Sequence, residues 1–177
     1  MVDDARILEK KLGFKICVGL ENLNQELVRS WKSGFKLVLI PLMNKEELTL
    51  SMLSRQLMQM QAHYSLDHNA KITLVVDELD LSFPSGISQR MPGNGFKNLC
   101  CRGRHFGVNV VGISQRAHMV DISFRANCNA FYLYRTAEPA DIDTGVKILG
   151  KEYRATLSKL NNFEYIYKDG QKIFVHK

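Results

Sequence analysis

Two adjacent carboxylates, Asp77 and Glu78, follow an uninterrupted apolar run at residues 72–76. Aliphatic and β-branched residues without a polar break are typical of a strand that is buried on both faces of a parallel sheet. Open α/β sheets bind their ligands at the carboxyl ends of such strands. Carboxylates in that place can hold the Mg²⁺ of a bound triphosphate and polarise an attacking water. The alternative is an ordinary buried strand that is followed by a helix-capping Asp.

The net charge of +6 is concentrated in the segment that follows these two acids. Between residues 84 and 127 a single acid, Asp121, accompanies a larger basic set: Arg90, Lys97, Arg102, Arg104, Arg116 and Arg125. A basic segment near a phosphate site is suited to nucleotide, to nucleic acid, or to both. Arg90 and Lys97 are the candidates for facing DNA, and an ordinary solvated surface is the alternative.

Length and composition indicate one globular domain that spans residues 1–177, with 45% hydrophobic and 24% charged residues. No apolar run approaches the roughly 20 residues that span a bilayer, and the acidic N-terminus does not resemble a signal segment. These features predict an intracellular protein. The four cysteines lack Cys-x-x-Cys spacing, so we expect reduced thiols rather than a zinc site.

Hydrophobic periodicity predicts strands that alternate with helices along the chain. Residues 3–14 are expected to be a connection into a short helix, and residues 116–126 a helix or a loop. The other expected helices cover residues 21–33, 44–64, 96–106 and 138–160, and the expected strands cover 15–19, 35–41, 72–76, 108–115, 130–135, 163–167 and 172–175. A Ser-, Pro- and Gly-rich loop is expected at residues 82–95, where it could lie over a ligand or a pore. This order predicts a three-layered parallel α/β sheet with an antiparallel C-terminal β-hairpin.

Four short motifs occur in a consistent order, at residues 75–78, 102–108, 112–116 and 138–141. With them the chain resembles the FtsK–HerA superfamily of DNA-pumping P-loop ATPases. It is most similar to the genome-packaging ATPases of tectivirus-type phages, which contain a membrane, and of their integrated relatives. The resemblance covers about residues 70 to 170.

The resemblance implies a P-loop NTPase fold of the ASCE type, with ATP and Mg²⁺ as cofactors. Asp77 is then the Walker B acid that holds the metal directly or through water, and Glu78 is the catalytic base. Gln115 matches the polar sensor beside the γ-phosphate. A neutral amide at a strand edge can bond a phosphate oxygen and the attacking water at once. A residue that caps the following helix is the alternative for Gln115.

Three arginines, Arg102, Arg104 and Arg116, are the candidates for a finger that reaches the nucleotide of a neighbouring subunit. A guanidinium offers two parallel donors to a phosphate. The residues alone do not choose among the three, and a surface or DNA-facing role stays open for each.

The phosphate-binding loop of this family, Gly-x-x-x-x-Gly-Lys-Ser/Thr, is not found in the sequence. Residues 145–151 come closest, but Glu152 replaces the hydroxyl residue and the segment lies in a helical pattern. The resemblance therefore implies that a strand, the P-loop and its helix are missing upstream. That strand would lie between the strands ending at Gln115 and Arg135, and its absence would leave two unpaired edges and an apolar slot.

The leading hypothesis is an ATP-driven motor subunit that moves double-stranded DNA, into a capsid, as a homo-oligomeric ring that is most simply a hexamer. A viral capsid vertex or portal is an expected partner, and the expected location is the bacterial cytoplasm or the virion. The second hypothesis is a catalytically inactive paralogue that serves as a DNA-binding or virion-assembly subunit. A nuclease-like metal site of Asp77, Glu78 and Asp80 is a third. It is disfavoured because successive strand side chains point to opposite faces.

Overall fold

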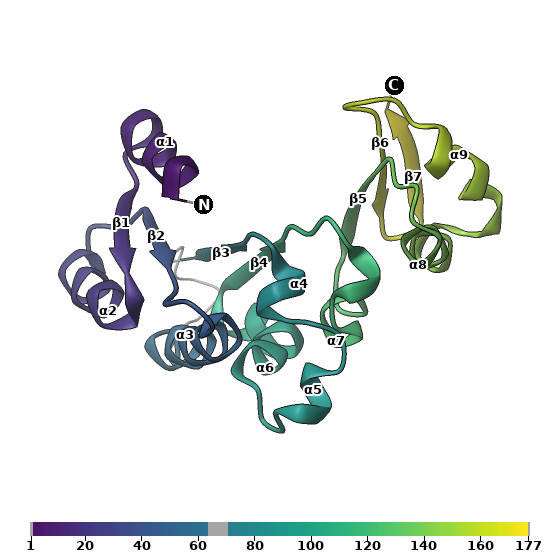
Figure 1. The fold of residues 1–177 in the computed structure, drawn as a ribbon. Coiled ribbons are helices and arrows are strands. Elements are labelled where there is room, and N and C mark those ends of the chain that lie inside the picture. Colours follow the sequence, from purple (N-terminus) through teal and green to yellow (C-terminus); the bar gives the residue numbers. More distant parts are fainter. Residues whose placement is uncertain (1, 64–70, 177) are drawn as a thin grey trace.

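The computed structural model describes residues 2–63 and 71–176 (Figure 1). The helices are α1 (Val2–Leu12), α2 (Gly19–Ser30), α3 (Glu46–Met60), α4 (Leu79–Ser82), α5 (Ile87–Arg90), α6 (Gly95–Arg102), α7 (Ile122–Arg125), α8 (Pro139–Leu149) and α9 (Arg154–Lys159), with 3₁₀ turns η1 (Gly103–Phe106), η2 (Ala117–Met119) and η3 (Lys151–Tyr153). The strands are β1 (Lys15–Val18), β2 (Leu37–Ile40), β3 (Ile72–Val76), β4 (Val108–Gly112), β5 (Ala130–Tyr134), β6 (Tyr165–Asp169) and β7 (Lys172–His176).

The described strands form three separate sheets instead of the single parallel sheet that the alternating pattern predicts. β1 pairs with β2 and β3 pairs with β4, each in parallel, while β5, β6 and β7 form an antiparallel sheet. Ile72 lies opposite Val108 and Val76 opposite Gly112, so β3 and β4 end at the same edge. The hairpin turns at Gly170, whose φ of 56° suits a residue without a Cβ. The predicted parallel α/β fold with a C-terminal hairpin is confirmed.

Helices α2, α3 and α6 lie on one side of strands β1 to β4 (Figure 1). α3 and α6 approach closely because Gly95 has no side chain. A Cβ at this position would lie 2.0 Å from the carbonyl oxygen of Ser51, and the Gly95 amide donates to the Ser51 hydroxyl at 2.8 Å. This contact places α6, and the strand β4 that follows it, beside β3.

The prediction that β3 is buried on both faces is wrong. Ile72 and Val76 face the helices and are buried, whereas the side chain of Val75 is 57% exposed. On the same face Val111 and Ile113 are 47% and 50% exposed. The helices that connect the parallel strands lie on a single side, so the described residues leave the other face open. We call Val75, Val111 and Ile113 the open sheet face.

β4 pairs only with β3, and β5 pairs only with β6, among residues 2–63 and 71–176. Each therefore keeps one edge without a partner strand in the described part of the chain. β2 and β3 likewise pair with one strand each in this part of the chain, so β4 and β5 are two of several strands with an unpaired edge.

The loop expected at residues 82–95 is instead a packed part of the core. It contains α5, and Phe83, Ile87 and Asn94 are fully buried. The ring of Phe83 meets the ring of Phe96 edge to face, with centroids 4.9 Å apart. Apolar residues between the Ser, Pro and Gly positions draw this segment inward, which excludes a free loop over a ligand.

The C-terminal part forms a second hydrophobic cluster beside the first, in which α8 and α9 cover the sheet β5–β6–β7 (Figure 1). The helix expected over residues 138–160 is interrupted at Gly150, whose φ is 126°. Gly145 lies inside α8, where a Cβ would approach Leu157 Cδ1 to 2.8 Å. Helix packing therefore explains this glycine, and residues 145–151 belong to α8 and η3 instead of a phosphate-binding loop. Within residues 2–63 and 71–176, every helix is too short or too polar to cross a bilayer.

Candidate functional site

The turn after β3 carries Asp77 and Glu78 and is fastened to the strand beside it. The amide of Ile113 donates to the carbonyl of Val76 at 2.9 Å, and the amide of Leu79 donates to the carbonyl of Ile113 at 2.9 Å. Asp77 and Glu78 lie between these two hydrogen bonds. The two acids are therefore held at the carboxyl edge of the parallel pair, where the sequence predicts them.

Glu78 adopts a left-handed backbone conformation, with φ 48° and ψ 49°. This conformation costs a non-glycine residue roughly 1–2 kcal/mol, because Cβ crowds the carbonyl oxygen. The Glu78 amide donates to a carboxylate oxygen of Asp77 at 2.9 Å, and the Asp77 side chain is otherwise exposed. Strained backbone of this kind concentrates at functional sites.

Gly112 makes room for the turn at the end of β4. A Cβ there would lie 2.5 Å from Leu79 Cδ2 and 2.6 Å from Phe124 Cζ. Leu79, which follows the two acids, therefore packs against Gly112 in the space that any larger side chain would occupy. A glycine inside a strand signals such a close approach, and this signal was available in the sequence.

Gln115 lies three residues beyond β4, at the edge that also carries Asp77. Its side chain is exposed, and within the described part of the chain it makes no hydrogen bond. Because β3 and β4 are parallel and in register, both residues project beyond the same edge. The amide is therefore free to contact a ligand bound there.

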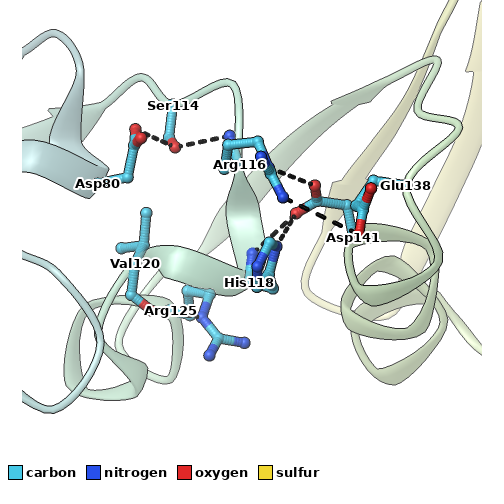
Figure 2. A network of polar contacts seen from close by, with 8 residues as sticks. All are labelled: Asp80, Ser114, Arg116, His118, Val120, Arg125, Glu138 and Asp141. Atoms are coloured by element: carbon cyan, nitrogen blue, oxygen red, sulfur yellow. Dashed lines mark hydrogen bonds and ion pairs between the residues drawn. The ribbon is translucent and has the colours of Figure 1, made fainter.

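The residues around Gln115 belong to a polar network (Figure 2). The Ser114 hydroxyl donates to Asp80 at 2.6 Å and accepts from the Arg116 amide at 3.1 Å. Asp80 is thus engaged with a hydroxyl, and no cluster of three metal-binding side chains occurs among residues 2–63 and 71–176. The structure gives no support to the nuclease-like metal site.

Arg116 points toward the start of α8 (Figure 2). Its Nε lies 3.5 Å from a carboxylate oxygen of Asp141, and an Nη lies 4.0 Å from Glu138. Asp141 also accepts from the amide and from Nδ1 of His118, each at 2.9 Å. Of the three finger candidates, Arg116 is therefore committed to a partner within its own chain.

The other two candidates, Arg102 and Arg104, lie far from Asp77 and Gln115. Both are exposed, and they end α6 and form η1 just before β4 begins. The five residues of β4 separate them from its carboxyl end by roughly 16 Å at about 3.3 Å per residue. Neither side chain therefore lies beside Asp77 and Gln115 of its own chain.

The residues expected to face DNA differ in their surroundings. Arg90 pairs with Glu47 of α3 at 3.1 Å, so part of its charge is compensated within the chain. Lys97 lies in the first turn of α6 and is half-buried. Neither contacts Asp77, Glu78 or Gln115.

Comparison with known proteins gives matches only at the level of structure. No family model matches the chain, and no curated protein matches it. The genome-packaging NTPase B204 of Sulfolobus turreted icosahedral virus 2, in complex with AMPPCP, superposes with a TM-score of 0.68 at 14% identity, over 98% of this chain and 91% of that chain. The same protein in complex with ATP-γS superposes with a TM-score of 0.66 at 14% identity, over 96% of this chain and 85% of that chain. The chain has the fold of a P-loop NTPase.

Two further P-loop NTPase structures match over less of their own length. The bacterial conjugative coupling protein TrwBΔN70 has a TM-score of 0.56 at 11% identity, over 85% of this chain and 43% of that one. VirB4 of Thermoanaerobacter pseudethanolicus has a TM-score of 0.51 at 15% identity, over 80% of this chain and 41% of that one. The fold that the motif resemblance predicts is confirmed.

Proposed function

We propose that this chain carries the hydrolytic half of an ATPase that moves double-stranded DNA into a capsid. One observation carries the proposal: Asp77, Glu78 and Gln115 all follow the carboxyl ends of two parallel, paired strands. In a P-loop NTPase fold this edge is the place for nucleotide chemistry. The likeness to B204, which packages a viral genome and was solved with ATP analogues, supports this function.

Asp77 suits a Mg²⁺ ion that comes with the nucleotide. The ion prefers one or two carboxylates together with phosphate oxygens and waters. Asp77 offers an exposed carboxylate with one oxygen engaged by the Glu78 amide, which leaves the other free. When bound, the ion would neutralise negative charge on the phosphates.

Glu78 is assigned the role of general base. Its carboxylate would accept a proton from the attacking water, while the Gln115 amide orients that water and donates to a phosphate oxygen. Glu78 and Gln115 both follow the carboxyl ends of β3 and β4, which the backbone hydrogen bonds of Ile113 hold side by side.

The phosphate cradle would come from a strand that inserts between β4 and β5. Both strands have an unpaired edge in the described residues, and the open sheet face beside them is apolar. An added strand would satisfy both edges, and the helix after its P-loop would cover Val75, Val111 and Ile113. We infer that the working motor includes such a unit.

A ring of subunits, most simply a hexamer, fits the position of the arginines. Arg102 and Arg104 lie at the edge remote from their own Asp77, so either one would serve as a finger only across a subunit boundary. The remaining basic residues, Arg90 and Lys97 among them, would contact DNA phosphates without reading bases. A capsid vertex or portal, in the virion or the host cytoplasm, is the proposed setting.

Calorimetry and hydrolysis assays test the proposal. The 177 residues alone should bind ATP weakly, and a polypeptide that adds an upstream strand, P-loop and helix should bind it tightly. In that longer protein Glu78→Gln should bind ATP but fail to hydrolyse it, whereas Glu152→Gln, at an exposed acid of η3, should retain activity. Tight ATP binding by the present chain, or normal turnover by the Glu78 variant, would contradict the assignment.

An inactive paralogue is the second candidate, because no phosphate-binding loop occurs in the sequence itself. It would serve as a DNA-binding or virion-assembly subunit. Under this hypothesis the longer protein also fails to bind ATP, while DNA binding persists in the Glu78→Gln variant. The same pair of assays therefore separates the two candidates.

A further inference from the structure

The residues on either side of Gln115 are fastened to two different elements. On one side, the Ser114 hydroxyl donates to Asp80 of α4 at 2.6 Å and accepts from the Arg116 amide at 3.1 Å. α4 begins directly after Glu78. The residue before Gln115 is thus tied to the turn that carries the two hydrolytic acids.

On the other side, Arg116 is tied to α8. Its guanidinium lies 3.5 Å from Asp141, whose side chain is only 4% exposed. A carboxylate this well buried is screened little by solvent. It is also fixed in place, because the amide and Nδ1 of His118 both donate to its second oxygen at 2.9 Å.

Between these two attachments the Gln115 side chain has no partner among the described residues. We propose that Asp80 and Asp141 are positioning residues that order the segment of Gln115 from both sides. Fixing the backbone of a residue costs conformational entropy, and a reacting group must be held within about 0.5 Å of its productive position. Asp141, which is buried, and Asp80, which is half-buried, therefore hold the segment of Gln115 in place before any nucleotide binds.

The attachment to Asp141 also links two parts of the fold. α8 packs on the sheet β5–β6–β7, whereas Asp80 belongs to the part that contains β3 and β4. Figure 2 shows the chain of contacts from Asp80 through Ser114 and Arg116 to Asp141. A shift of α8 relative to β4 would therefore move Gln115.

Backbone ¹⁵N relaxation of the 177-residue chain tests the ordering directly and needs no nucleotide. Gln115 should have an order parameter near about 0.85 in the unchanged chain and below about 0.6 in Asp141→Asn and in Ser114→Ala. Amides of β3 and α3 should not change, which separates a local role from general loss of structure. Unchanged order at Gln115 in both variants would overturn the proposal.

Matched controls lie close by. Asp143 is on α8 as well, but it pairs with Arg154 rather than with the Gln115 segment, so Asp143→Asn should leave Gln115 ordered. Ser158→Ala removes an exposed hydroxyl that bonds only to a carbonyl of its own helix. If Asp141→Asn does not fold, Arg116→Gln breaks the same pair at an exposed position.

A kinetic measurement extends the test and rests on the proposed function. In the longer, hydrolysing protein, Asp141→Asn should lower kcat by on the order of 10²-fold with KM unchanged, since misplacement by about 1 Å has that effect. Normal kcat in a variant with a disordered Gln115 would overturn the positioning role. If Glu78 proves dispensable, the proposed function fails, and the relaxation experiment still decides whether Asp80 and Asp141 order Gln115.

Discussion

The backbone at Glu78 can be tested without any nucleotide. With φ 48° and ψ 49°, this residue is in the left-handed region, where Cβ is the source of the strain. Its side chain makes no hydrogen bond or ion pair within residues 2–63 and 71–176 that would repay the strain. No side-chain contact among the described residues therefore offsets the strain at Glu78.

Replacement by glycine should stabilise the chain even though it removes a functional group. Removing Cβ relieves roughly 1–2 kcal/mol of strain, and the greater flexibility of glycine in the unfolded chain costs about 0.5–1 kcal/mol. Glu78→Gly should therefore be more stable than Glu78→Gln by about 0.5–1 kcal/mol, since glutamine keeps Cβ. For a chain of this size 1 kcal/mol corresponds to about 2–4 °C, so the midpoint of thermal unfolding should be about 1–4 °C higher for Glu78→Gly than for Glu78→Gln.

Urea denaturation with a constant m value measures the difference. Phe163→Gly is a matched positive control, because Phe163 has φ 70° and its side chain is 92% exposed, so little packing is lost. The strain at Glu78 is refuted if Phe163→Gly is more stable than the unchanged chain but Glu78→Gly is no more stable than Glu78→Gln.

Three other predictions concern the scaffold. Gly95→Ala should lower the free energy of unfolding by about 3 kcal/mol or more, because the new Cβ would overlap the Ser51 carbonyl at 2.0 Å; a loss below 1 kcal/mol in urea would contradict this contact. Burial alone would raise the pKa of Asp121, but hydrogen bonds from Ser123 and Ser88 outweigh it and lower the pKa below its ordinary value. Its contribution to stability is therefore complete above about pH 3.9 and disappears as pH falls through the folded pKa, and Asp121→Asn should flatten the stability profile in that acid range. Iodoacetamide should modify exposed Cys101 first, because burial raises the pKa of Cys128 to about 11; equal rates by mass spectrometry would refute this order.

Local patterns of the sequence determined much of the fold and of the site. The apolar run before Asp77, the alternation of strands and helices, and the Asp169–Gly170 turn each depend on neighbouring residues, and each is present in the structure. The failures also have local causes. Gly150 interrupts a helical pattern that continues on either side, and residues 82–95 contain turn formers whose intervening apolar side chains are buried.

Only the tertiary structure decided which charged residues act together. Asp80 and Asp141 carry no motif that ties them to Gln115, because their contacts join residues 34 and 25 positions apart through side-chain geometry. The strain at Glu78 and the exposure of Val75 likewise depend on what packs against β3, which periodicity does not report. The sequence by itself determined that acids and an amide end neighbouring strands. The folded chain determined that β3 and β4 share an edge, that Arg116 is held by α8, and that Arg102 and Arg104 lie at the opposite end, since strand register and helix packing set these distances.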